Sequence, residues 1–123
     1  MKEKIHILIV DDDTFFLDMY SMRFKTAGYE VATASNGKDA LDKLQTIIPD
    51  IILLDLTMPV MDGFQTLKQI QKEDRLKKVK VIMLTNKGEP EDITLCDKYG
   101  AIGYIIKANS TPTEVVERVN TFL

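Results

Sequence analysis

Short apolar runs and amphipathic segments alternate along the whole chain. The runs are rich in β-branched residues, and few polar positions interrupt them. Runs of this length and character are typical of strands that are buried on both faces, as in a parallel sheet. The pattern predicts five strands, near Ile5 to Val10, Tyr29 to Ala34, Ile51 to Leu54, Val81 to Leu84 and Ala101 to Ile106.

Apolar residues at helical spacing fill the segments between these runs. Phe16, Tyr20 and Phe24 share one face of a first helix, and Gly28 is a typical C-terminal stop. The clearest helix start is Thr111-Pro112-Thr113-Glu114, which combines an N-cap, a proline at the first helical position and a capping-box glutamate. Three further helices are marked by Leu41, Leu44 and Ile48 after the N-cap Asn36, by Phe64, Leu67 and Ile70, and by Pro90 with Glu91 and Asp92.

Strand and helix therefore alternate five times, which predicts an α/β fold with a parallel sheet and helices on both faces. The crossovers between parallel strands are expected to be right-handed. No internal repeat, low-complexity tract or linker rich in proline, glycine and serine interrupts the pattern. We expect one domain over residues 1–123, with no effector domain.

Composition and charge exclude several classes of function. Hydrophobic residues make up 45% of the chain, charged residues 28%, and the net charge is −3 without the basic stripe of a nucleic-acid binder. No apolar run approaches the roughly 18 residues that a membrane span needs. Cys96 is the only cysteine, which excludes an intrachain disulfide and suits a reducing compartment. We expect a cytoplasmic protein that contacts neither nucleic acid nor membrane directly.

Candidate chemistry gathers where the predicted strands end, which is where open α/β sheets place their sites. Asp11 and Asp12 follow the first strand, Asp55 closes the third, and Thr85 and Lys107 follow the fourth and fifth. If the first and third strands are neighbours, three carboxylates meet and repel one another. A divalent cation relieves that repulsion, and hard oxygen ligands of this kind favour Mg²⁺.

This set of groups suits the transfer of a phosphoryl group to Asp55. A carboxylate nucleophile, a metal ion, a lysine and a hydroxyl together supply positioning and charge neutralisation, which dominate such transfers. Asp13 is interpreted differently, as an acidic residue favoured at a helix start. Taken alone, Asp11 and Asp12 are open to the same interpretation.

Five segments hold these residues in a distinctive order: Ile7-Leu8-Ile9-Val10-Asp11-Asp12-Asp13, Leu53-Leu54-Asp55-Leu56-Thr57-Met58-Pro59, Met61-Asp62-Gly63, Met83-Leu84-Thr85 and Tyr104-Ile105-Ile106-Lys107. Their order and spacing resemble the response-regulator receiver family of two-component signalling over essentially the whole chain. The resemblance implies a flavodoxin-like (βα)5 fold, a doubly wound parallel five-stranded sheet with strand order 2-1-3-4-5.

The resemblance also implies a role for each matching residue. Asp55 would be the phosphorylated aspartate, and Asp11 and Asp12 the acidic pair that binds Mg²⁺ directly or through water. The backbone carbonyl of Thr57 would complete the metal site. The remaining positions would be Thr85 as the switch hydroxyl, Lys107 as the phosphate-contacting lysine and Tyr104 as the switch aromatic.

Two positions depart from the family pattern. Ala108 stands where the family usually has a cis proline, and a cis bond before a non-proline residue costs about 2.5–4 kcal/mol. Either this loop is trans or the packing offsets the strain. Asn86 stands where a smaller residue is common, and Lys87 follows it. The candidate modulators of the phosphoryl site are therefore Thr57, Asn86, Lys87 and Ala108.

By this resemblance the chain is a signalling switch that assists its own phosphorylation and dephosphorylation, and not a conventional enzyme. A histidine kinase or a histidine phosphotransfer protein would present phosphohistidine to Asp55. Phosphorylation would then shift a two-state equilibrium at a surface of the fourth helix, fifth strand and fifth helix, where a downstream protein binds. Formation of a homodimer is left open.

Three other functions compete with this interpretation. An aspartyl-phosphate phosphatase typically has a second aspartate two residues after the nucleophile, where this chain has Thr57. A flavin or nucleotide binder needs a phosphate-cradling loop after the first strand, where Asp11, Asp12 and Asp13 carry the opposite charge. A phosphorylation-independent protein-binding module of receiver shape stays open because of Ala108.

Overall fold

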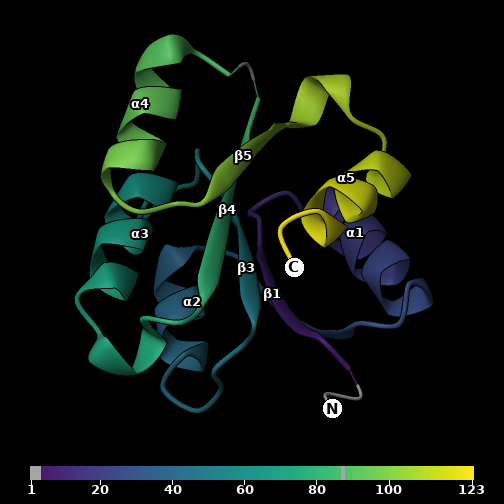
Figure 1. Cartoon of the computed structure of the whole chain (residues 1–123), viewed down its shortest axis with the longest axis horizontal. Helices are drawn as coiled ribbons and strands as arrows, with labels where there is room; N and C mark the ends of the chain where they lie inside the picture. Colours follow the sequence, from purple (N-terminus) through teal and green to yellow (C-terminus); the bar gives the residue numbers. More distant parts are fainter. Residues whose placement is uncertain (1–3, 87) are drawn as a thin grey trace.

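A five-stranded parallel sheet forms the centre of this computed structural model, which describes residues 4–86 and 88–123 (Figure 1). The strand order is β2-β1-β3-β4-β5, as the resemblance implied. The chain reverses its direction of travel across the sheet after β2, so β1 and β3 lie side by side. The strands are β1 His6–Val10, β2 Glu30–Ala34, β3 Ile51–Asp55, β4 Lys80–Thr85 and β5 Gly103–Ile106.

Helices cover both faces of the sheet, with α1 and α5 on one side and α2, α3 and α4 on the other (Figure 1). Three of them begin as predicted: α2 at the N-cap Asn36, α4 with Pro90 at its first position, and α5 at the Thr111–Glu114 capping box. None of the described helices is long and apolar enough to cross a membrane. The helices are α1 Thr14–Thr26, α2 Gly37–Lys43, α3 Gly63–Gln71, α4 Pro90–Lys98 and α5 Pro112–Asn120, with short 3-10 turns η1 Asp74–Leu76 and η2 Lys107–Asn109.

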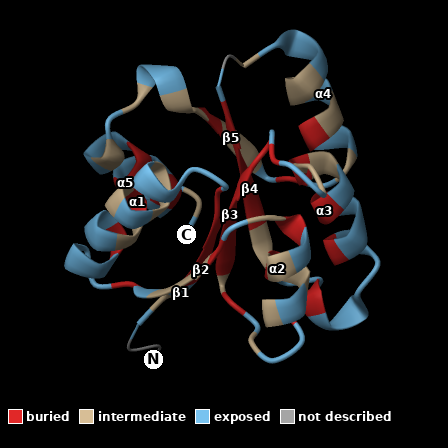
Figure 2. Ribbon diagram, turned by 180° about the vertical axis from the view of Figure 1, so that it is seen from behind, coloured by how far each residue is buried: buried red, intermediate tan, exposed pale blue. Residues whose placement is uncertain are grey.

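The hydrophobic core consists of two layers separated by the sheet. Because successive side chains of a strand point to opposite faces, each central strand contributes to both layers. In β3, Ile52 and Leu54 pack toward α2, α3 and α4, whereas Ile51 and Leu53 pack toward α1 and α5. Figure 2 shows this burial as a continuous band along the middle strands. The near-continuous apolar runs of the sequence are explained by this burial on both faces.

Two details differ from the sequence pattern. The second helix was expected to reach Ile48, but α2 ends at Lys43 and Ile48 is 60% exposed. The chain tightens after Lys43 into a turn in which the Thr46 amide donates to the Lys43 carbonyl at 3.1 Å. Pro49 also disfavours helical backbone at Ile48. The second difference is that β2, although apolar, is an edge strand and is only half-buried along most of its length.

Candidate functional site

The carboxyl ends of the strands bring the predicted acidic residues together. Val10 of β1 pairs with Leu54 of β3, so the residues that follow them, Asp11 and Asp55, stand side by side. One carboxylate oxygen from each of Asp11, Asp12 and Asp55 lies within 4.8 Å of the other two. The cluster therefore follows from the crossover that places β1 next to β3.

Two of these three carboxylates are buried. Asp11 is 0% exposed and Asp55 is 3% exposed, whereas Asp12 is exposed at the mouth of the site. Burying a charged group without compensation is costly, because it loses its hydration. The only described cation in salt-bridge contact with the cluster is Lys107. One lysine facing three carboxylates leaves the site rich in negative charge.

Lys107 enters the cluster from the loop after β5. Its Nζ atom lies 2.8 Å from Asp11 Oδ2 and 3.5 Å from Asp55 Oδ1, and its side chain is only 7% exposed. The ammonium also lies 4.7 Å from the centroid of the Phe16 ring, which α1 supplies. The bond between Lys107 and Ala108 is trans, and both residues form part of η2. The lysine thus reaches the cluster without a cis bond.

Burial changes the protonation of the cluster. It raises the pKa of Asp55 to about 7, an effect that Lys107 opposes and that the charges of Asp11 and Asp12 reinforce. The same environment raises the pKa of Tyr20 to about 12, mainly through burial and then through Asp11 and Asp55. Near neutral pH, therefore, Asp55 is held close to the midpoint of its titration. Any added cation would favour its ionised form.

The donor atoms fit a hard divalent cation. Asp11 Oδ1 accepts a hydrogen bond from the Asp13 amide at 2.9 Å, which fixes the carboxylate. Its other oxygen, Oδ2, touches Lys107 but receives no directed hydrogen bond from any described residue. A buried oxygen of this kind, beside two further carboxylates, is a ligand atom with free coordination capacity.

The other described site candidates of the loops lie at the strand ends or in the segments that follow them. Thr85, the last residue of β4, is 4% exposed, and its Oγ1 accepts a hydrogen bond from the Gly88 amide at 3.3 Å. Thr57, Asn86 and Ala108 are exposed in the surrounding loops. Lys87 lies outside the described residues.

The loop after Asp55 is tightly constrained. A Cβ atom on Gly63 would lie 2.4 Å from the Asp55 carbonyl oxygen, so only glycine allows α3 to begin this close to β3. Asp62 and Gln65 close a capping box at the same helix start. Val60, in the middle of the loop, has φ 70°, which is strained for a β-branched residue.

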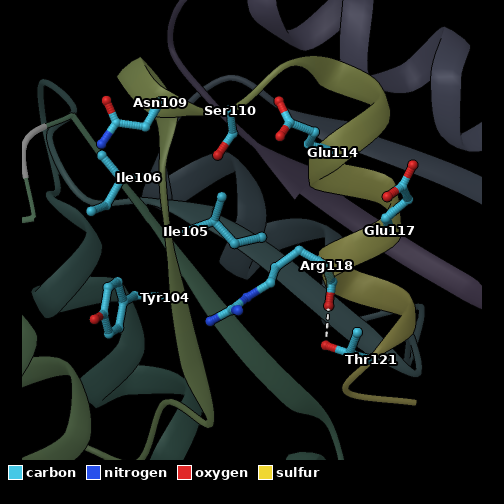
Figure 3. Close-up of a pocket in the computed structure, with 9 residues that line it drawn as sticks. All are labelled: Tyr104, Ile105, Ile106, Asn109, Ser110, Glu114, Glu117, Arg118 and Thr121. Carbon is cyan, nitrogen blue, oxygen red and sulfur yellow. Dashed lines mark hydrogen bonds between the residues drawn. The ribbon is translucent and has the colours of Figure 1, made fainter.

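Tyr104 lies on β5, where it pairs with Met83 of β4. It is half-buried and packs against the core layer on the side of α2, α3 and α4. Figure 3 shows its ring and the Ile105 side chain on opposite sides of β5, with Ile105 toward α5. A pocket between β5 and α5 is lined by Ile105, Glu114, Arg118 and their neighbours.

The sequence pattern did not reveal that two aromatic residues of α1, Phe16 and Tyr20, lie beside Lys107 and the acidic cluster. Phe16 and Tyr20 were expected only to mark the buried face of a helix. Their rings stack with centroids 5.9 Å apart and an interplanar angle of 24°, and the Phe16 ring faces Lys107. The available signal was position: Phe16 stands four residues after Asp12, in the first turn of the helix that leads away from the cluster.

Comparison with known proteins agrees with this geometry. The family model of the response regulator receiver domain matches residues 7–120. Chemotaxis protein CheY of Thermotoga maritima is 38% identical over 115 residues, which is 93% of both chains. The solved structure of the chemotaxis response regulator CheY4 of Vibrio cholerae has a TM-score of 0.91 at 33% identity, covering 98% of this chain and 99% of that one.

Longer regulators also match. A protein-glutamate methylesterase/protein-glutamine glutaminase of Bacillus licheniformis is 42% identical over 111 residues, which is 87% of this chain but 30% of the relative. The alkaline phosphatase synthesis transcriptional regulatory protein PhoP of Bacillus subtilis is 38% identical, over 95% of this chain and 48% of its own length. The chain thus spans less than half of these two relatives, and only their receiver portion is matched. It belongs to the response regulator receiver family of two-component signalling.

Proposed function

We propose that this receiver accepts a phosphoryl group on Asp55 from the phosphohistidine of a histidine kinase or a histidine phosphotransfer protein. The observation that carries the proposal is the buried cluster of Asp11, Asp55 and Lys107 at the junction of β1 and β3. Burial, reinforced by the neighbouring acids, raises the pKa of Asp55 to about 7. A buried carboxylate of this kind costs stability, and such costly groups with perturbed pKa values are concentrated at functional sites. The family membership supports the same conclusion.

The transfer forms one bond and breaks another. A carboxylate oxygen of Asp55 bonds to phosphorus while the bond between phosphorus and the donor's imidazole nitrogen breaks. The electron pair of that bond stays on the imidazole, which takes up a proton as it leaves. Asp55 must be ionised to attack, so the groups that favour its carboxylate form favour the reaction.

Asp11, Asp12, Asp55 and the backbone carbonyl of Thr57 are the residues that would hold Mg²⁺. The bound ion would supply positive charge to the phosphoryl oxygens and favour the ionised form of Asp55. Asp13 contributes indirectly, because its amide holds Asp11 Oδ1 in place while its side chain caps α1. These contacts pre-organise the Asp11 carboxylate before any cation binds.

Lys107 and Thr85 are the proposed phosphoryl contacts. Lys107 already points its ammonium at Asp55, and Thr85 holds a hydroxyl at the end of the neighbouring strand. Thr57, Asn86, Lys87 and Ala108 surround the site in sequence and are proposed to modulate the lifetime of the phosphoryl group. Four distinct loops therefore contribute to a single reaction centre.

The proposed output is a change on the surface formed by α4, β5 and α5, where a downstream protein would bind. Tyr104 stands in the strand at the centre of this surface, and its half-buried ring has room on the α4 side, where a second pocket adjoins it. In Figure 3 the same strand borders the pocket against α5. A shift of Tyr104 between outward and inward positions would alter both neighbours of β5.

Intact mass after incubation with acetyl phosphate and Mg²⁺ tests the proposal. The expected result is a single added phosphoryl group, absent with EDTA and absent from Asp55→Asn. Beryllofluoride, which mimics a phosphoryl group on an aspartate, should bind the wild type and not that variant. If the wild type gains no mass and binds no beryllofluoride, the proposal is wrong and a phosphorylation-independent module becomes the better interpretation.

A further inference from the structure

We propose that Phe16 is a positioning residue for the reaction: the face of its ring holds the ammonium of Lys107 in the phosphoryl cleft. The inference rests on the proposed function, because it assigns Lys107 to the phosphoryl group. The observation that carries it is the distance of 4.7 Å between Lys107 Nζ and the centroid of the Phe16 ring. Neither charge nor hydrogen-bonding capacity marks Phe16 in the sequence.

The surroundings of the ammonium explain why a ring matters here. The Lys107 side chain is 7% exposed, so little water reaches its three N–H donors. Two carboxylate oxygens contact the ammonium: Asp11 Oδ2 at 2.8 Å and Asp55 Oδ1 at 3.5 Å. The electron-rich face of Phe16 supplies a third contact, and such contacts are strongest where water is excluded.

The loop that carries Lys107 provides little constraint of its own. It is a single 3-10 turn, Lys107–Asn109, in which the Lys107 carbonyl accepts a long hydrogen bond of 3.3 Å from the Ser110 amide. Ala108 is exposed and follows a trans bond. The position of the ammonium is therefore determined by the groups that it contacts and not by the backbone of the loop.

Phe16 is itself held firmly enough to serve this purpose. It lies one turn before Tyr20 on α1, and the two rings stack. Tyr20 is 1% exposed and belongs to the core layer beneath α1 and α5. The α1 start is closed by Asp13, which accepts a hydrogen bond from the Phe15 amide at 3.0 Å. The buried Tyr20 ring thus supports the Phe16 ring, which in turn contacts the Lys107 ammonium.

The contact can be tested without any metal or phosphoryl donor, by NMR of protein labelled with ¹³C at the lysine ε carbons. Protons above a ring face are shifted upfield, so the Lys107 signal, identified by its loss in Lys107→Arg, should stand upfield in the wild type. It should move downfield in Phe16→Leu and stay in place in Phe16→Tyr. Lys68, whose Nζ lies 4.5 Å from the Tyr99 ring centroid, is an internal reference that Phe16 variants should leave unchanged.

Reactivity is tested with acetyl phosphate, which avoids any kinase contact. Phe16→Leu should slow phosphorylation of Asp55 by about three- to tenfold, as expected for loss of a desolvated cation–π contact, and Phe16→Tyr should restore the rate. Phe122→Leu is the matched control. Phe122 is also a half-buried phenylalanine that faces a cation, Arg118, but it lies beside Lys80 and Gly103, where β4 and β5 begin, at the other end of the strands from the acidic cluster. In a Lys107→Met background, the leucine change at Phe16 should have no further effect. If Phe16→Leu folds poorly by circular dichroism, Phe16→Met replaces it.

The outcomes separate the inference from the proposed function. Lack of phosphorylation in the wild type overturns the proposed function, and with it the part that Phe16 plays in the reaction. The Lys107 signal then still decides whether the contact between Phe16 and Lys107 exists. A phosphorylated wild type with an unshifted Lys107 signal overturns the inference alone. So does a Phe16→Leu rate equal to that of the wild type, or an equal loss in Phe122→Leu.

Discussion

The interior and the end of β3 are both buried, but burial has opposite energetic effects on them. Ile51, Ile52, Leu53 and Leu54 are all 0% exposed, and burying their apolar surface stabilises the fold. Asp55, the next residue, is almost as deeply buried, and burial raises its pKa to about 7. The same strand therefore places stabilising apolar side chains next to a carboxylate whose burial is costly. Stability is concentrated inside the strands and reactivity at their carboxyl ends.

The largest effect is expected inside the strand. Leu53→Ala should lower the free energy of unfolding by about 2–5 kcal/mol, because it removes buried methyl groups and leaves a cavity. Chemical denaturation measures this loss directly. Leu123→Ala is a suitable control, since that leucine is 44% exposed and should change stability little. Equal losses in the two variants would contradict the view that stability lies in the strand interior.

The second effect is expected at Asp55: near neutral pH, Asp55→Asn should stabilise the fold, whereas Leu53→Ala destabilises it. The folded pKa of Asp55, about 7, lies above the ordinary 3.8, so the folded state favours the protonated carboxyl. In metal-free protein, the contribution of Asp55 to the free energy of unfolding should therefore be fully present below about pH 4 and be lost as the pH rises toward 7, by an amount on the order of 2–4 kcal/mol. Asp55→Asn cannot ionise, and this part of the pH dependence should disappear from it.

Denaturation of both proteins in EDTA at several pH values between 4 and 8 checks this expectation. The two should have similar stability near pH 4, and the asparagine variant should be the more stable near pH 7.5. Curves that stay parallel over the whole range would show that Asp55 has no raised pKa. Adding Mg²⁺ near pH 7.5 should then stabilise the wild type more than the variant, because the variant lacks one carboxylate ligand.

The smallest effect is expected in the loop after Asp55. Val60 has φ 70° and is 80% exposed, so its side chain adds backbone strain and little burial. Val60→Gly should raise the free energy of unfolding by about 0.5–1 kcal/mol, which is the relief of strain less the extra entropy of glycine in the unfolded chain. Val60→Ala, which keeps a Cβ atom, should gain less. Lower stability in the glycine variant would mean that the loop conformation is not strained.

Much of the fold was readable in the sequence. Uninterrupted apolar runs predicted the strands within about two residues, because burial on both faces leaves little freedom of residue type. Asn36 and the Thr111–Glu114 box begin helices as predicted, since capping depends on local hydrogen bonds. Pro90 also begins a helix as predicted, because its fixed φ suits the first helical position. The second helix was extended too far, to Ile48, because helical spacing alone does not show where a helix ends.

The site was predictable only in part. The proximity of its three aspartates and Lys107 was predicted, because parallel strands deliver their following residues to one edge of a sheet. The roles of these residues and of Thr85 stay predictions. The contact between Phe16 and Lys107 was not found, because it joins the first helix to the loop after the last strand. Nothing local connects residues so far apart in the chain.

The sequence by itself determined which segments are strands and helices, and which polar residues stand at the strand ends. These properties depend on the alternation of side chains, on local hydrogen bonds and on the cost of burying polar groups. Only the tertiary structure decided that Asp11 and Asp55 share one buried site, that a trans loop still brings Lys107 within 2.8 Å of Asp11, and that Phe16 faces that lysine. Those distances depend on how the crossovers pack α1 and the β5–α5 loop against the same edge of the sheet.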